Sequence, residues 1–150
     1  MSPTEDQGQQ AARRGGCYCG AVSYTVTGKP VLSAYCHCTI CQRLNGCPFV
    51  HTLHFSPSAL QWTHIGGNTA LDMYRVKDKP AKQRFRCKTC GSCIASYHSE
   101  RQSWSILGAQ LERIPEDFKP TAHIFYGTRL LDVNDGLDKW EGYQGKSRRL

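Results

Sequence analysis

The chain has 150 residues, 39% of them hydrophobic and 10% aromatic, so it can bury a core and is the usual size of one domain. Its formal net charge is +7, with lysine and arginine scattered along the chain, which argues against a nucleic-acid-binding surface. No apolar run approaches the roughly 18 residues that a membrane-spanning helix needs, so we expect no membrane segment.

The two ends of the chain have the composition of solvated segments. Residues 1–14 contain no apolar stretch like that of a signal peptide, and Glu5 and Asp6 are unusual in a mitochondrial transit peptide. The last residues, "KSRRL", form a short basic tail. We therefore expect a disordered leader at 1–14, one domain at 15–143 and a basic tail at 144–150, in a cytoplasmic protein.

Alternation of apolar and polar residues predicts strands through most of the chain. Residues 22–27, "VSYTVT", alternate in this way and end at the turn sequence "GKP". Further strands are predicted at 49–55, 60–65, 70–76, 83–86, 94–97, 103–107 and 122–126. Helix is expected only in a turn or two after Cys41, near residues 58–60 and in "DGLDKW" near the end. The sequence thus predicts a mainly β, mostly antiparallel domain with little helix.

Cysteine is the residue type that points to chemistry. Eight of the nine cysteines lie in tight groups, Cys17/Cys19, Cys36/Cys38/Cys41 and Cys87/Cys90/Cys93. Disulfide scaffolds are denser in cysteine, and nine is an odd number. Local groups of two or three sulfurs are what a tetrahedral zinc site requires, with each sulfur about 2.3 Å from the ion. The spacing therefore predicts metal ligation.

Two of the groups begin with a pair of cysteines followed by glycine. Cys17 and Cys19 are two residues apart, so both sulfurs point to one face of an extended chain, whereas Cys87 and Cys90 bracket a tight turn. The glycine after each pair permits the positive φ that such turns favour. Two such pairs on one ion would form a closed four-thiolate site, whose value is folding energy.

The middle group differs because Cys36, Cys38 and Cys41 can reach one ion without help. Three protein ligands with an exchangeable fourth position are typical of catalytic zinc. Alternatively, Cys93 or His37 supplies the fourth ligand, and this site is structural too. The spacing decides neither this question nor which groups share an ion.

Other polar residues give weaker signals. His51 and His54 lie on a predicted strand with their side chains on opposite faces, so we expect no joint metal site there. Arg43 either pairs with a substrate carboxylate or is a solvated side chain. The three aspartates within residues 132–138 are expected to be turn and cap residues. The pattern assigns no role to Cys47.

Four segments together resemble the family of glutathione-dependent formaldehyde-activating enzymes and centromere protein V. These segments are "GGCYCGAVSY", "CHCTICQRLNGCPFV", "FRCKTCGSCIASY" and "PTAHIFYGTRLLDVNDGLDKWEGY", and the resemblance runs from about residue 15 to residue 143. It implies a β-tent of small antiparallel sheets with zinc knuckles and two zinc ions per chain. Matched to the family motifs, the structural zinc ligands are Cys17, Cys19, Cys87 and Cys90, and the catalytic zinc ligands are Cys36, Cys38 and Cys41.

The resemblance also implies a carbon–sulfur lyase similar to S-(hydroxymethyl)glutathione synthase, with glutathione or a thiol adduct as substrate. The alternatives are a lyase or addition step on another small carbonyl or thiol compound, and a non-catalytic carrier or scaffold. The family often has "DGLP" near its C-terminus where this chain has "DGLD". If that region contacts substrate, we expect the substrate to differ from that of the family.

Overall fold

The computed structural model describes residues 11–150 and shows a mostly β chain with two sheets. The smaller sheet is antiparallel, with β1 (Arg13–Gly16), β2 (Ser23–Val26) and β5 (Leu60–His64) in the order β1-β2-β5. No helix in the described residues is long and apolar enough to cross a membrane.

The larger sheet has eight strands in the order β11-β10-β3-β4-β9-β8-β7-β6. All neighbours are antiparallel except the two parallel pairs that β10 makes with β3 and β11. Its strands are β3 (Leu32–Cys36), β4 (Val50–Phe55), β6 (Leu71–Arg75), β7 (Lys82–Cys87), β8 (Cys93–His98), β9 (Ser103–Leu107), β10 (Ala122–Ile124) and β11 (Asp138–Lys139).

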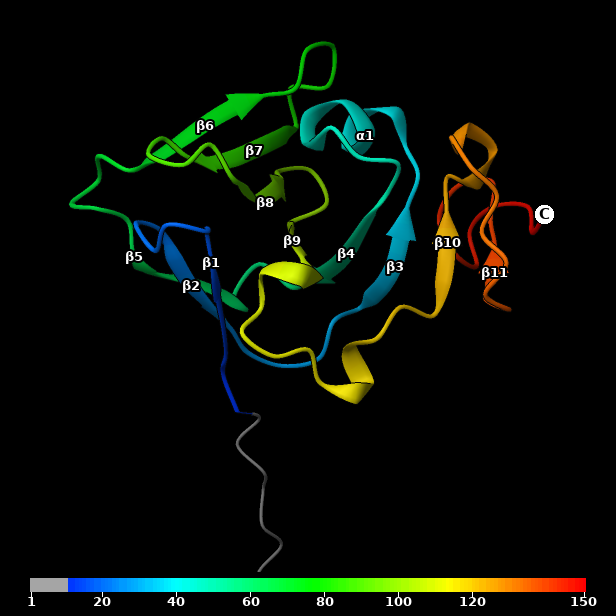
Figure 1. The fold of residues 1–150 in the computed structure, drawn as a ribbon, viewed down its shortest axis with the longest axis horizontal. Helices are drawn as coiled ribbons and strands as arrows, with labels where there is room; N and C mark the ends of the chain where they lie inside the picture. The colour runs from blue at the N-terminus through cyan, green and yellow to red at the C-terminus, as the bar shows by residue number, and fades with distance from the viewer. Residues whose placement is uncertain (1–10) are drawn as a thin grey trace, which may run out of the picture.

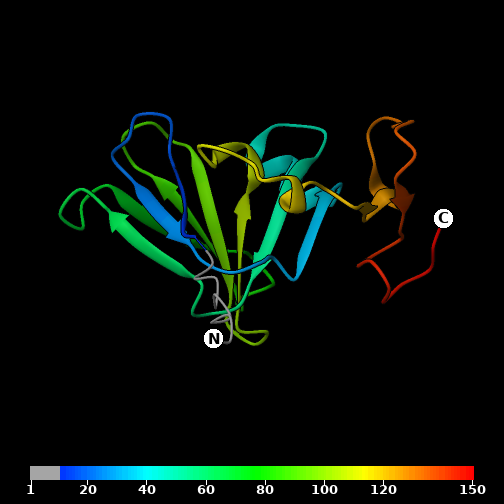
Figure 2. The same ribbon diagram turned by 90° about the horizontal axis from the view of Figure 1, so that it is seen from below.

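The two sheets are inclined to each other (Figures 1 and 2). In Figure 2 the blue strands β1 and β2 lie on one side, and the cyan β3 and the orange and red C-terminal residues lie on the other. The main apolar core joins the small sheet to strands β4, β8 and β9, with Tyr24, Leu53, Phe55, Ile94 and Ile106 almost fully buried. A second, smaller apolar cluster surrounds Cys36 and Cys41.

The only α-helix within residues 11–150, α1 (Thr39–Asn45), begins directly after Cys38 and contains Cys41 of the middle cysteine group. Cys38 is its N-cap, and the Cys38 sulfur accepts a hydrogen bond from the Cys41 amide at 3.3 Å. Gly46 ends the helix in the left-handed region, at φ 60°. The other helices in the described part of the chain are three short 3-10 helices, Gly108–Gln110, Glu116–Phe118 and Tyr126–Thr128. The expectation of little helix is confirmed.

The structure corrects several element predictions. Strands β1 and β3 were not predicted from the sequence, and β1 includes residues that were assigned to the leader. The rest of that leader lies mainly in residues 1–10, outside the described residues. The helices expected near 58–60 and in "DGLDKW" are wrong: the first region is a turn leading into β5, and the second contains β11, beside β10.

Candidate metal centres

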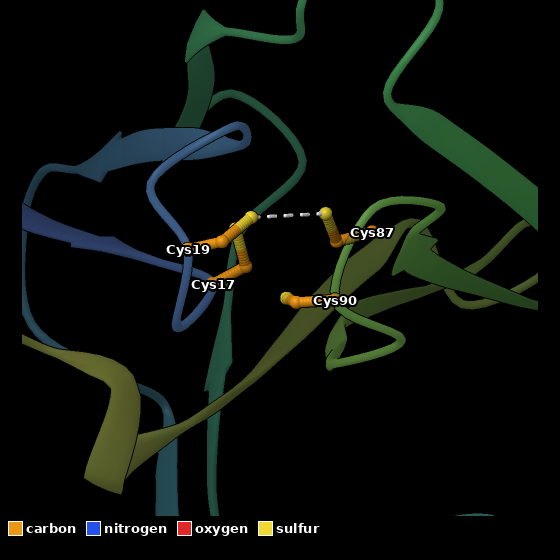
Figure 3. A group of neighbouring side chains, drawn as sticks. All are labelled: Cys17, Cys19, Cys87 and Cys90. Carbon is orange, nitrogen blue, oxygen red and sulfur yellow. Dashed lines mark hydrogen bonds between the residues drawn. The ribbon is translucent and has the colours of Figure 1, made fainter.

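Cys17, Cys19, Cys87 and Cys90 form the first sulfur group, at the meeting point of the two sheets. The first pair lies in the β1–β2 loop. Cys87 ends β7 and Cys90 lies in the β7–β8 loop, and Figure 3 shows the sulfurs pointing toward one another. All four sulfurs lie within 4.8 Å of one another, with Cys19 Sγ at 3.6 Å from Cys17 Sγ and 3.8 Å from Cys87 Sγ. The fold thus brings together two cysteine pairs that lie about seventy residues apart in the sequence.

Local backbone hydrogen bonds shape both loops. In the first loop the Cys17 amide donates to the Val22 carbonyl at 3.0 Å, and the Val22 amide donates to the Cys17 sulfur at 3.3 Å. In the second loop the Gly91 amide donates to the Cys87 carbonyl at 2.9 Å, which requires the positive φ of 77° that glycine adopts without strain. Both glycines after the cysteine pairs have positive φ, as the sequence predicted.

The four-sulfur geometry fits a tetrahedral zinc ion. Sulfurs 2.3 Å from a central ion form a tetrahedron with edges of about 3.8 Å, close to the sulfur–sulfur distances in this group. Ser92 Oγ lies 3.2 Å from Cys90 Sγ, and its hydrogen bond lowers the pKa of Cys90 to about 5, which favours the thiolate form that metals bind.

Cys36, Cys38 and Cys41 form the second group, and their sulfurs also lie within 4.8 Å of one another. Cys36 ends β3, whereas Cys38 and Cys41 lie in the cap and first turn of α1, so the strand-to-helix turn gathers all three. Cys36 and Cys41 are buried, and Cys38 is partly exposed. This group also has the ligand type and spacing of a metal site.

The structure separates both alternative fourth ligands from this second group. Among residues 11–150, no further histidine, cysteine, aspartate or glutamate joins the three sulfurs. The Cys93 thiol instead donates to the Leu44 carbonyl at 3.5 Å. His37 directs Nε2 to Nδ1 of His123 at 2.8 Å, and both imidazoles are fully buried. A tetrahedral ion on this group would therefore have one position for an external ligand.

Electrostatics around the second group also favour a cation. Hydrogen bonds from Cys36 and Cys41 lower the pKa of Cys38 to about 2, while the hydrogen bond with Cys38 raises the pKa of Cys36. The first thiolate therefore forms easily and the others form at a cost that a divalent cation would offset. Arg84 already places Nη2 3.9 Å from the Cys41 sulfur, and its Nε is buried without a partner in the described structure.

The second group opens onto a cleft of about 830 Å³. Strands β7, β8 and β9 and the C-terminal segment contribute to its walls. The charged side chains that line it are five cations and two carboxylates, Lys79, Lys82, Arg84, Arg101, Lys146, Asp78 and Glu100. This excess of positive charge beside the sulfurs suits an anionic ligand. These cations could not be assigned to the site from the sequence, because they come from segments far in sequence from Cys36, Cys38 and Cys41.

Of the weaker candidates, only His54 lines the cleft. His51, on the same strand, instead makes a hydrogen bond with Ser33 Oγ at 2.9 Å, so the two histidines share no site, as expected. Arg43 is exposed in the last turn of α1, away from the cleft. Cys47 donates to the Phe49 carbonyl at 3.4 Å and belongs to neither sulfur group.

Comparison with known proteins identifies the family. The model of the glutathione-dependent formaldehyde-activating enzyme family matches residues 12–128, more than three quarters of the chain. The chain belongs to this family. Both sulfur groups lie within the matched residues, whereas the C-terminal segment from residue 129 lies beyond them.

A solved structure shows the same fold. The crystal structure of a Rhodobacter sphaeroides protein matches with a TM-score of 0.52 and 23% sequence identity, over 69% of this chain and 91% of that one. At this identity the likeness concerns the fold alone. The family name describes formaldehyde activation that depends on glutathione, and the cysteine groups fit two metal ions.

Proposed function

We propose that this protein is a zinc-dependent carbon–sulfur lyase resembling S-(hydroxymethyl)glutathione synthase, which adds the thiol of glutathione to formaldehyde or a related carbonyl compound. One observation carries the proposal: three cysteines without a fourth protein ligand, among the described residues, border a cation-lined cleft. Family membership supplies the substrate class.

The two sulfur groups have different roles in this proposal. Cys17, Cys19, Cys87 and Cys90 hold a structural zinc that links the two sheets, whereas Cys36, Cys38 and Cys41 hold the catalytic zinc. A zinc ion held by these three cysteines would stabilise an external thiol as its thiolate and polarise a carbonyl oxygen. Because cysteines must be reduced to bind metal, we place the protein in the reducing cytoplasm.

The cleft supplies substrate binding. Glutathione carries two carboxylates, and Lys82, Arg101 and Lys146 line the cleft that contains its proposed thiol position. The Arg101 guanidinium lies 4.8 Å from the ring centre of Tyr143, which also lines the cleft, so a cation–π contact holds Arg101 at the cleft wall. Cations at this wall would hold the carboxylates while the sulfur reaches Cys36, Cys38 and Cys41.

The reaction needs no oxidant or reductant. The thiol loses its proton, the sulfur forms a bond to the carbonyl carbon, and the carbon–oxygen π bond opens. The oxygen then takes up one proton, so the product is a hydroxymethyl thioether. Holding both reactants together supplies most of the acceleration that such an addition requires. His54 remains neutral in the cleft near pH 7, because burial and nearby cations lower its pKa to about 4.

Calorimetry tests the thiol site. Glutathione is titrated into wild type, Cys38→Ser and Cys93→Ser in two buffers of different ionisation enthalpy. We expect wild type to bind with proton release, because a coordinated thiol loses its proton. Cys93→Ser should behave like wild type and is the matched control, whereas Cys38→Ser should lose binding. If only Cys93→Ser binds, Cys93 closes the native site and the proposal is wrong.

Catalysis is tested separately, because the adduct also forms without an enzyme. Exchange NMR at equilibrium measures the rate at which formaldehyde joins and leaves glutathione, with and without protein. Wild type should raise this rate and Cys38→Ser should not. Binding without any increase in rate would instead indicate a carrier of glutathione adducts.

A further inference from the structure

A buried chain of hydrogen bonds connects the second sulfur group to the C-terminal segment. Asp135 Oδ2 accepts from His123 Nε2 at 2.8 Å, and His123 Nδ1 lies 2.8 Å from His37 Nε2. Both imidazoles are fully buried, whereas the Asp135 side chain is 30% exposed. In the sequence His37 lies between Cys36 and Cys38, so this chain of hydrogen bonds ends at a residue between two of the three cysteines.

The carboxylate sets the direction of these hydrogen bonds. Asp135 can only accept when ionised, so His123 presents an N–H at Nε2. A proton at Nδ1 of His37 would be buried without an acceptor, so His37 carries its N–H at Nε2 and donates it to Nδ1 of His123. This leaves Nδ1 of His37 with a lone pair only, and that atom is buried without a partner in the described structure. The arrangement fixes both ring tautomers and the orientation of His37.

Asp135 is itself held in place. Its Oδ1 accepts from the Leu137 amide at 3.1 Å, and Lys139 Nζ lies 3.7 Å from the same oxygen. Burial raises the pKa of Asp135, but the hydrogen bonds from His123 and Leu137 and the charge of Lys139 outweigh it, so the pKa is lowered. The carboxylate is thus ionised at neutral pH and is a fixed anchor for the chain.

The backbone of His37 is anchored on both sides. Its amide donates to the Ile124 carbonyl at 3.0 Å, and its carbonyl accepts from Gln42 Nε2 at 2.8 Å and Thr128 Oγ1 at 2.9 Å. The ring packs against Phe49, with 4.7 Å between ring centres. Rotation of this one residue would carry the sulfurs on either side of it apart.

We propose that Asp135 and His123 are positioning residues that act through His37 to hold the sulfurs of Cys36 and Cys38 in their convergent arrangement. This inference rests on the proposed metal role of the three-sulfur group. Asp135 lies in the C-terminal segment, beyond the residues 12–128 that the family model matches. Without this anchor, the residues around His37 would lose conformational freedom when the metal binds, and this entropy cost would lower the metal affinity.

Metal affinity is the direct test. Zinc binding to wild type, Asp135→Ala and Asp135→Asn is measured by competition with a chelating dye, and the cobalt(II) absorption spectrum reports the sulfur geometry. We expect Asp135→Ala to weaken the second zinc roughly tenfold to hundredfold and to alter the cobalt bands, with the first zinc unchanged. Asp135→Asn keeps an acceptor oxygen and should lose less. Asp132→Asn, a nearby exposed carboxylate paired with Arg129, is the control and should match wild type.

Two substitutions of His123 distinguish its hydrogen bond with His37 from its hydrogen bond with Asp135. His123→Asn places an amide near the former Nδ1 and keeps an acceptor for His37, whereas His123→Gln reaches only toward Asp135. We therefore expect His123→Asn to retain more zinc affinity than His123→Gln. If a buried variant does not fold, Asp135→Ala decides the question, because its side chain is partly exposed.

The outcomes distinguish this inference from the proposed function. If the wild type binds two zinc ions and the folded Asp135→Ala protein has wild-type affinity and cobalt spectrum, with only a lower melting temperature, the chain is structural and the inference is wrong. If the wild type binds only one zinc ion, the proposed function and this inference both fail.

Discussion

Loss of one sulfur should have very different effects on stability in the two groups. Cys87 is fully buried, and its group links loops whose cysteines are 68 residues apart. Treated as a cross-link, a connection across about seventy residues stabilises the fold by about 4 kcal/mol. Cys87→Ser removes part of that link and buries a hydroxyl, which costs a further 1–3 kcal/mol by the usual estimate.

Cys38→Ser is the matched change in the other group. Its three sulfurs span only six residues, so the same relation gives about 2 kcal/mol at most. Serine is also a favoured N-cap, so α1 should keep the hydrogen bond that the Cys38 sulfur accepts from the Cys41 amide. The two variants should therefore differ in stability by at least about 2 kcal/mol.

Thermal unfolding at fixed free zinc measures this difference. We expect Cys87→Ser to lower the melting temperature by roughly 8–16 °C and Cys38→Ser by less than half of that. Cys47→Ser, outside both groups, should leave it unchanged. A strong chelator should reduce the gap between wild type and Cys87→Ser to the cost of the hydroxyl. Equal losses in the two cysteine variants would contradict the division into a structural and a substrate-binding site.

Three further results are expected. Elemental analysis should give two zinc ions per chain, as the two sulfur groups predict, and about one in Cys38→Ser; iron, or a single zinc in the wild type, would contradict the assignment. Glutathione affinity should fall with added salt, and Arg101→Gln should weaken it about fivefold, because the cleft cations bind its carboxylates; a salt-independent affinity would exclude this. Burial first, and then nearby cations, lower the pKa of His54 from 6.5 to about 4, so His54 contributes stability above pH 6.5 that is lost as pH falls toward 4. His54→Gln should flatten this decline in the free energy of unfolding, and parallel pH curves for the two proteins would show that His54 is not responsible.

Strand prediction succeeded at β2 because one face of this strand is buried. Val22, Tyr24 and Val26 are fully buried and alternate with more exposed residues, so period-two patterning identifies β2. Strand β3 lacks this pattern, because Ser33 is buried although polar. Ser33 Oγ is satisfied by His51 Nε2 and the Phe118 carbonyl, partners that the sequence does not reveal.

The C-terminal segment was misread for a similar reason. "DGLDKW" has residues compatible with a helix, but Gly136 adopts a φ of 77°, which a helix does not contain. The Trp140 amide donates to the His123 carbonyl at 2.9 Å, so the segment pairs with β10 instead. Tertiary pairing decided this conformation, and local propensity did not.

The second sulfur group was predictable because it is local in sequence. Cys36, Cys38 and Cys41 need only one turn to converge, and the structure brings them together. Whether Cys93 joins them depends on how β8 packs, and the spacing of the cysteines carries no information about that packing. The chain from His37 to Asp135 was also out of reach, since its members are 86 and 12 residues apart and Asp135 resembles an ordinary turn residue.

The central claim is that an external thiol binds a metal ion held by Cys36, Cys38 and Cys41. X-ray absorption at the zinc edge tests it directly when the selenium analogue of glutathione replaces glutathione, because selenium is distinguishable from the cysteine sulfurs. We expect a zinc–selenium contact in wild type and in Cys93→Ser, and none in Cys38→Ser. Zinc-replete wild type that shows only zinc–sulfur contacts at saturating selenol would contradict the claim.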